Sequence, residues 1–368
     1  MRYTLRFFGL FRCVTMSEAT SSPPAPAAPI VATNGPAAAP PSLQAIGLNK
    51  EYGSIRAVQN LNFSVARGEI VGFLGPNGAG KSTTMRIFAG LLSATSGRAY
   101  VAGIPVARYP EEAKRHLGYM PEHNPLPDDM RVSEYLHFRA RLKEIPRPQI
   151  NGRVEEVIEA CGLQHKTRRK LIGTLSKGYR QRVGIADAIL SKPEVILMDE
   201  PTIGLDPIQI QSIRRLIDSL RGQLTVLISS HILPEIEMCC DRVMIINQGR
   251  LVAAGTSKSL RREFFTRATW RLRLSGDVAA FEQLLPEVNP ALRLAACSPA
   301  DGEGFVEMRL EGPVDDAGLG EKLLAAVMKR GGWRVREFAQ LEPGLEEIFL
   351  TATKSSHDRL APFGAPAK

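Results

Sequence analysis

The stretch of sequence that decides the fold is Gly75-Pro76-Asn77-Gly78-Ala79-Gly80-Lys81-Ser82-Thr83. It fits the pattern G-x-x-x-x-G-K-[ST] at every fixed position, which is the pattern of a phosphate-binding loop. An apolar run at residues 70–74 precedes it and predicts a buried strand, while residues 82–91 are compatible with a helix. A strand–loop–helix order is the context this loop requires, so the sequence predicts a nucleotide site here.

The residue types of the loop suit a bound phosphate chain. Glycines let the backbone approach closely and turn its N–H groups inward, and the N-terminus of the next helix adds partial positive charge. Lys81 would reach the β- and γ-phosphates, and the Ser82 hydroxyl would bind Mg²⁺. The residues expected to contact the nucleotide are Gly75, Pro76, Asn77, Gly78, Ala79, Gly80, Lys81, Ser82 and Thr83.

The composition of the chain limits which classes of protein it can belong to. The chain has 368 residues, is 44% hydrophobic, and holds no uninterrupted apolar stretch long enough for a transmembrane helix. The net charge of +9 could favour nucleic acid or an anionic membrane, but the basic runs are short, which favours a solvated basic surface. Five cysteines without a C-x-x-C pair argue against a disulfide framework and a zinc site, and fit a reducing cytosol.

The chain divides into four predicted segments. Residues 1–41 are rich in Pro and Ala and are expected to be disordered, with Met16 as an alternative start. Residues 42–264 alternate apolar and amphipathic segments, which predicts an α/β domain. Its expected strands are 98–102, 195–198 and 224–229, its helices are 131–143, 151–161, 178–190 and 208–221, and residues 243–247 and 249–254 form a closing hairpin.

Residues 265–353 predict a small α+β accessory domain, followed by a flexible tail at 354–368. The order is β-α-β-β-α-β, which is the split βαβ or ferredoxin-like arrangement. The expected strands are 269–274, 293–296, 305–310 and 333–340, the helices are 278–285 and 318–330, and a last helix spans 343–353.

Two acidic residues follow a buried strand in the larger domain. Residues 195–198 are apolar and are followed by Asp199 and Glu200. A parallel strand would deliver both carboxylates to the edge where open α/β sheets bind ligands. Asp199 could then join the Mg²⁺ sphere, and Glu200 could polarise an attacking water.

A capped helix is predicted from Leu175-Ser176-Lys177-Gly178-Tyr179-Arg180-Gln181-Arg182. Ser176 suits the N-cap position, and Gly178 permits close approach of a ligand to the positive end of the helix. By itself this would be an ordinary helix start.

Taken together, these motifs resemble the ATP-binding cassette of ABC transporters. The phosphate loop, L-S-K-G-Y-R-Q, the apolar strand ending in Asp199-Glu200, then Gly204-Leu205-Asp206 and His231 occur in that family's order. The resemblance covers about residues 43–256. It implies a P-loop ATPase with a helical subdomain, and ATP and Mg²⁺ as cofactors.

The resemblance also implies roles for individual residues. Tyr52, just after a predicted strand, would stack on adenine, and His231 would contact the γ-phosphate beside Glu200. Ser176 and Gly178 would contact the γ-phosphate held by Lys81 of a second copy, in a head-to-tail dimer, with Asp206 across the same interface.

Three positions depart from the family pattern. Lys177 stands where Gly is usual, and Tyr179 where Gln is usual. Glu122, in Gly118-Tyr119-Met120-Pro121-Glu122-His123-Asn124, replaces a usual Gln; a carboxylate can still bind Mg²⁺, so Glu122 joins Ser82 and Asp199 as an expected ligand.

The expected function is that of an ATPase subunit energising a separately encoded integral membrane permease, which would hold it at the inner face of the plasma membrane. Residues 121–136 and the C-terminal extension look most like ABC-2-type exporters, and closest to gliding-motility-associated cassettes. A ribosome-binding ATPase would carry a second phosphate loop, and a chromosome-maintenance ATPase a long coiled coil after Lys81. Neither is present in the sequence, so no stable nucleic-acid partner is expected, although a regulatory ATPase stays open.

Overall fold

The computed structural model describes residues 40–164, 166–265, 267–314, 316, 318–341 and 344–360. The expectations for residues 1–39 and 361–368 lie outside these ranges. Within them, no helix combines the length and the apolar character needed to cross a membrane.

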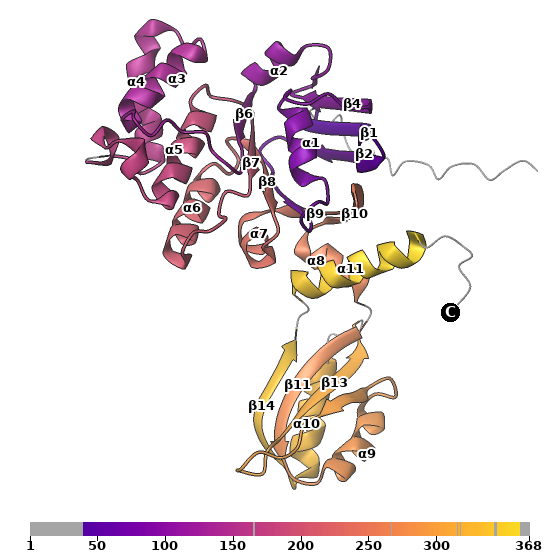
Figure 1. The fold of residues 1–368 in the computed structure, drawn as a ribbon. Helices are drawn as coiled ribbons and strands as arrows, with labels where there is room; N and C mark the ends of the chain where they lie inside the picture. Colours follow the sequence, from indigo (N-terminus) through magenta and orange to yellow (C-terminus); the bar gives the residue numbers. More distant parts are fainter. Residues whose placement is uncertain are drawn as a thin grey trace, which may run out of the picture. The chain divides into compact units, whose positions relative to one another are not determined.

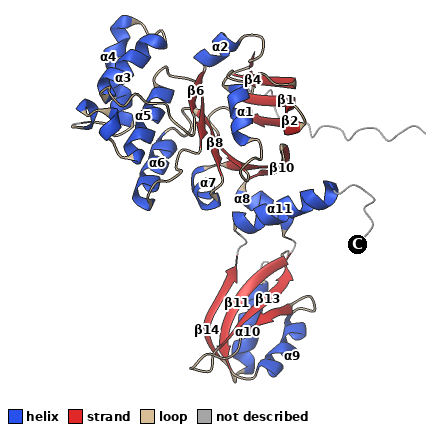
Figure 2. Ribbon diagram, viewed as in Figure 1, coloured by secondary structure: helices blue, strands red, loops and turns tan. Residues whose placement is uncertain are grey.

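Six strands form the main sheet of the larger region, in the order β10-β9-β3-β8-β7-β6 (Figures 1 and 2). Five run parallel, and β10 pairs antiparallel with β9 as the expected closing hairpin. The strands are β3 (Ile70–Leu74), β6 (Leu117–Met120), β7 (Val195–Asp199), β8 (Thr225–Ser230), β9 (Arg242–Asn247) and β10 (Arg250–Gly255). Because parallel strands end at one edge, β3, β7 and β8 deliver the segments that follow them to the same place.

A second, antiparallel sheet has the order β2-β1-β4-β5. Its strands are β1 (Leu43–Tyr52), β2 (Ile55–Val65), β4 (Ser96–Val101) and β5 (Ile104–Pro105). One face packs against α1 (Lys81–Phe88), where the ring of Phe63 lies 5.8 Å from that of Phe73 and 5.7 Å from that of Phe88, between centroids. Phe63 of the second sheet thus contacts both β3, which precedes the phosphate loop, and α1, which follows it.

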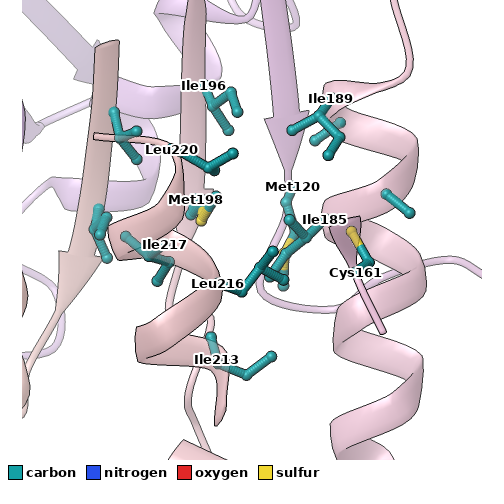
Figure 3. Close-up of a cluster of buried hydrophobic side chains, with 14 of the residues drawn as sticks. Met120, Cys161, Ile185, Ile189, Ile196, Met198, Ile213, Leu216, Ile217 and Leu220 are labelled. Atoms are coloured by element: carbon teal, nitrogen blue, oxygen red, sulfur yellow. The ribbon is translucent and has the colours of Figure 1, made fainter. Parts of the chain in front are cut away.

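Three helices pack against one another on the β6 side of the sheet, and of these α5 contacts β6: α3 (Val132–Leu142), α4 (Arg147–Ala160) and α5 (Lys177–Ile189) (Figure 1). Shorter pieces are α2 (Pro110–Arg115), η1 (Thr167–Arg169) and η2 (Ile172–Thr174), and α6 (Pro207–Ser219) and α7 (Leu233–Cys239) complete the region. On α6 the apolar side chains recur at helical spacing, and Figure 3 shows them facing β7 and α5. They are Ile213, Leu216 and Ile217, together with Leu220 at the C-cap.

The smaller region has the predicted β-α-β-β-α-β order, and its antiparallel sheet is ordered β12-β13-β11-β14. This is the ferredoxin-like arrangement. Its elements are β11 (Arg267–Ser275), α9 (Val278–Val288), β12 (Arg293–Cys297), β13 (Val306–Pro313), α10 (Leu319–Arg330) and β14 (Arg334–Leu341). Alternate residues of β11, including Trp270 and Leu272, pack with Phe281 and Leu323 of the two helices in a core of their own.

Two helices flank the smaller region in sequence, α8 (Ser257–Phe264) and α11 (Leu345–Leu360). The sequence groups α11 with the accessory domain. In the structure, however, Leu345, Ile348 and Ala352 of α11 belong to the core cluster of the main sheet, and α11 contacts α8. The smaller region is therefore inserted between two helices that pack on the larger one.

Several predicted boundaries differ from the observed ones. The helix predicted at 82–91 ends at Phe88, ahead of Gly90 with its positive φ of 65°, and the strand predicted at 98–102 ends at Val101 because Ala102 and Gly103 form a turn with positive φ. The helix predicted at 151–161 already begins at Arg147, because Pro148 lies in its first turn, where no N–H is required. The last helix continues to Leu360, since neither Gly nor Pro occurs between Thr353 and Pro362.

Candidate active site

The phosphate loop connects β3 to α1 as the sequence predicts. Two glycines in it are required by close packing: a Cβ at Gly75 would lie 2.5 Å from the Ile246 carbonyl oxygen, and one at Gly80 would lie 2.4 Å from that of Ala57. Gly80 also has φ of 102°, which L side chains rarely adopt. Pro76, Asn77 and Gly78 are exposed at the tip of the loop, Ala79 is buried, and Thr83 is half-buried at the start of α1.

Lys81 is buried and points back into its own loop. Its Nζ donates to the carbonyl oxygens of Gly75 at 2.7 Å and Pro76 at 3.3 Å. The same Nζ lies 3.6 Å from Oε1 of Glu200, and both side chains are 6% exposed. The ammonium therefore lies within a ring of oxygen atoms, in the position from which it would meet a phosphate.

Ser82 and Asp199 meet at the mouth of the loop. The Ser82 hydroxyl donates to Oδ1 of Asp199 at 3.1 Å, and the Ser229 hydroxyl bonds the same oxygen. Ser229 lies opposite Asp199 in the register of β7 and β8. A hydroxyl and a carboxylate thus converge at one point, and both are oxygen ligands of the kind Mg²⁺ prefers.

Glu200 is held at the end of β7 with an unusual backbone. Its φ is +49°, its side chain is buried, and its N–H donates to the Ser229 carbonyl oxygen at 3.2 Å and the Ser229 hydroxyl at 3.0 Å. His231 follows β8 and places Nδ1 2.9 Å from Oε2 of Glu200. The structure thus brings together three of the predicted residues, Lys81, Glu200 and His231.

Glu122 does not lie beside Ser82 and Asp199. Its side chain is 37% exposed, 3.9 Å from Nδ1 of His123, and no contact in the described part of the chain joins it to Ser82 or Asp199. Tyr119 of β6 lies nearby, where burial and then the negative charge of Asp199 raise its pKa, and a hydrogen bond from Arg86 acts against both.

Tyr52 is the last residue of β1, where it is 47% exposed, and Nζ of Lys50 lies 5.1 Å from its ring centroid. Across residues 40–360, as far as they are described, no contact joins Tyr52 to the phosphate loop. An exposed ring in that position is available for stacking.

Ser176, Gly178 and Asp206 form a second group. Ser176 occupies the N-cap position of α5, but its hydroxyl makes no capping bond. Gly178 packs on Gln209, whose side-chain oxygen would lie 2.6 Å from a Cβ at that position, while the N–H of Gln209 donates to Asp206 at 2.8 Å. The starts of α5 and α6 are therefore neighbours, yet none of the described contacts links this group to Lys81.

Two residues beside the site are not predicted from the sequence. Ser229 follows an apolar strand, as Asp199 does, so the same argument about strand ends could have found it. Tyr119 carries no such signal, because its position depends on how β6 lies beside β7.

Comparisons with known proteins agree with this geometry. Residues 58–203 match the family model described as ABC transporter. The chain is 33% identical over 316 residues to the linearmycin resistance ATP-binding protein LnrL of Bacillus subtilis, covering 84% of this chain and 98% of that protein. It is 44% identical over 207 residues to the bacitracin transport ATP-binding protein BcrA of Bacillus licheniformis, covering 56% of this chain and 66% of that one.

Among solved structures, the cbiO1 protein of Clostridium perfringens, described as part of the ABC transporter complex cbiONQ, is similar with a TM-score of 0.55 and 29% identity. That likeness covers 61% of this chain and 94% of cbiO1. With the phosphate loop, the paired acids and the histidine at one sheet edge, the chain belongs to the ABC transporter family, as an ATP-binding subunit that hydrolyses ATP.

Proposed function

We propose that this subunit works as a head-to-tail pair, with MgATP between the phosphate loop of one copy and the Ser176 turn of the other, and that it energises a membrane permease for export. One observation carries the proposal. In a single chain Ser176 is exposed at the start of α5, its hydroxyl makes no hydrogen bond with the described residues, and it does not contact Lys81. Both the hydroxyl and the start of the helix are suited to an anion, which a second copy would supply.

Mg²⁺ would be held by Ser82 and Asp199 together with the phosphates. Among the described residues there is no group of three or more His, Cys, Asp and Glu side chains placed for a metal ion. Mg²⁺ needs few protein ligands when phosphates and water supply the rest, so the Ser82–Asp199 pair fits. Glu122 would add a third oxygen after a movement of its loop.

In the proposed reaction, the γ-phosphate replaces Glu200 beside Lys81. Lys81 lies beside Oε1 of this carboxylate and His231 beside Oε2. When the contact with Lys81 is broken, His231 still orients Glu200, which can then accept a proton from water. Ser176, Gly178 and Asp206 of the second copy would close the site, and Tyr52 would stack on adenine.

The pair can be tested with Glu200→Gln, which keeps the ATP contacts but removes the base. We expect size-exclusion chromatography with light scattering to show pairs with ATP and single chains with ADP. The double variant Lys81→Ala/Glu200→Gln should stay single in both nucleotides. Single chains only, in Glu200→Gln at saturating ATP, would contradict the head-to-tail arrangement.

For the permease, we propose a groove of about 1320 Å³ beside α3 and α4 as the docking site. Exposed Leu91 and Leu142 give it apolar contacts, while its basic side chains already pair with acidic ones, as Lys143 does with Asp187 and Lys192 with Glu156. A short amphipathic segment that places apolar side chains against Leu91 and Leu142 would fit this groove. Such a partner would keep the subunit at the cytoplasmic face of the membrane.

Docking can be tested with Leu142→Glu, which places a charge in the apolar part of the groove. Membranes from cells that express the permease should retain the parent subunit through a salt wash and release the variant, while basal ATP hydrolysis stays unchanged. Equal retention of the two proteins would count against this docking site.

Export is the direction that the relatives support. The printed names of LnrL and BcrA concern linearmycin resistance and bacitracin transport, and resistance fits removal of a compound from the cell. The ABC-2 class and the likeness to gliding-motility cassettes stay predictions.

A further inference from the structure

The turn between β9 and β10 packs against the phosphate loop. Gly249, in this turn, donates its N–H to the carbonyl oxygen of Ala79 at 2.9 Å, and Ala79 is a buried residue of the loop. A Cβ at Gly249 would lie 2.8 Å from the carbonyl oxygen of Ala57 in β2, the same oxygen that approaches Gly80. The turn, the first part of β2 and the phosphate loop are therefore in direct backbone contact.

The backbone of this turn is one that residues other than glycine rarely adopt. Gln248 and Gly249 both have positive φ, of 48° and 77°, as a type I′ hairpin turn requires. Asn, Asp or Gly is usual at the first of these positions, because their backbones tolerate the left-handed region and that of Gln does not. The conformation of Gln248 is therefore held by contacts from outside the turn, and Gln59 supplies them.

Gln59 of β2 contacts the turn at three points. Its N–H donates to the carbonyl oxygen of Gly249 at 2.8 Å, and its Nε2 donates to the carbonyl oxygen of Gln248 at 3.0 Å. Its Oε1 accepts from Arg250, at 3.3 Å from Nε and 3.0 Å from Nη2. One side chain thus bridges the residue with the left-handed backbone and the first residue of β10.

We propose that Gln59 is a positioning residue for nucleotide binding, which acts through Gly249 and Ala79 on the phosphate loop. The backbone N–H groups of such a loop surround the phosphates, so a shift of the loop weakens several phosphate contacts at once. ADP and ATP share the phosphates nearest the loop, so Gln59 raises the affinity for both nucleotides. Among the described residues no hydrogen bond joins Gln59 to Glu200 or His231, so the hydrolysis step itself does not depend on it.

The test measures binding of MgADP by isothermal titration calorimetry, since ADP is not hydrolysed. Gln59→Met keeps the length of the side chain and removes its polar atoms. Loss of its hydrogen bonds to the turn should raise the dissociation constant about fivefold or more. In steady-state ATP hydrolysis, KM should rise by a similar factor while kcat stays within about twofold, which is the signature of lost binding alone.

Two further variants accompany Gln59→Met. Gln44→Met in the neighbouring strand β1 is the matched control, because Gln44 is also half-buried and no hydrogen bond in the described part of the chain joins its side chain to the turn or the loop. It should bind ADP as the parent does. Gln59→Glu keeps the acceptor for Arg250 and loses only the donor to Gln248, so its dissociation constant should fall between the other two. It also tests the proposal should Gln59→Met not fold.

Thermal unfolding separates this role from a merely structural one. A lower Tm in Gln59→Met with an unchanged dissociation constant for ADP would show that Gln59 only stabilises the hairpin, and would overturn the proposal. An equal loss of affinity in Gln44→Met, or a fall in kcat without a change in KM, would overturn it as well. The measurement on ADP involves single chains, so none of these outcomes bears on the head-to-tail pair.

Discussion

Glu200 is the residue at which local backbone strain and the proposed chemistry coincide. Its left-handed backbone costs on the order of 1 kcal/mol for a residue other than glycine. Two hydrogen bonds from its N–H to Ser229 hold that conformation, and they turn the carboxylate toward Lys81 and His231. The strain is therefore located where a precise direction of the carboxylate is needed.

At this scale we predict that Lys81→Ala abolishes ATP turnover. The variant removes the cation that faces the phosphates and leaves the buried Glu200 carboxylate without its ammonium, so turnover should fall about a hundredfold or more. A coupled phosphate-release assay should place it near the parent protein in EDTA, where Mg²⁺ is withheld. Lys114→Ala, an exposed lysine paired with Glu111, serves as the control with normal turnover. Near-normal turnover in Lys81→Ala would contradict the role assigned to this lysine.

At the scale of elements, the backbones of β6 and α5 lie so close together at Gly118 that no side chain fits between them. A Cβ at Gly118 would lie 2.3 Å from the backbone oxygen of Ala188. The helix α5, which Ser176 precedes as the N-cap residue, therefore packs directly on β6, the strand that precedes Glu122. Movement of one element must be transmitted to the other, because the space between them cannot be compressed.

We predict that Gly118→Ala lowers the free energy of unfolding by about 1–3 kcal/mol, since the added methyl group forces backbone atoms apart. Gly152→Ala on α4 is the matched control, because a Cβ there meets nothing within 4 Å and alanine favours a helix. Urea unfolding of the two variants should give opposite signs, and equal stability would contradict the close contact.

The sequence predicted the elements near the nucleotide well, for reasons that lie in particular residues. The apolar runs of β3, β7 and β8 identify buried strands, and the residues after them must meet at one edge. The contribution of Ser229 depends on its register opposite Asp199, which no local pattern reveals. The amphipathic pattern of α11 indicates a buried face but not its partner, so the sequence alone assigns this helix to the smaller region, whereas it packs on the larger one. The relation of Ser176 to Lys81 involves two copies and cannot be read from one chain.

At the scale of the whole molecule, the smaller region is an insertion. Its entry and exit are adjacent, because Thr269 near the start of β11 lies opposite Leu341 at the end of β14. The helices on either side, α8 and α11, contact each other, and α11 contributes to the core of the larger region. The smaller region could thus be removed without opening that core.

We predict that deletion of residues 267–341, with a short Gly/Ser linker in their place, leaves basal ATP turnover within about twofold of the parent, because every residue assigned to the site lies outside the deletion. Truncation after Leu341 instead keeps the smaller region and removes α11, and it should cost about 3–6 kcal/mol of stability from lost burial of Leu345 and Ile348. Thermal unfolding and turnover measured on both variants check this. A stable, active truncation together with an inactive deletion would show that the larger region needs residues 267–341 and not α11, which would contradict this prediction.

The bonds from Lys81 to the carbonyl oxygens of Gly75 and Pro76 have a kinetic consequence. They hold the lysine against the loop that would receive the phosphates, so fewer side-chain rotations remain to be fixed when a phosphate binds. Little conformational entropy is then lost when the site fills. We therefore expect refilling after each turnover to be limited by diffusion and by departure of the spent nucleotide, and not by slow ordering of the loop.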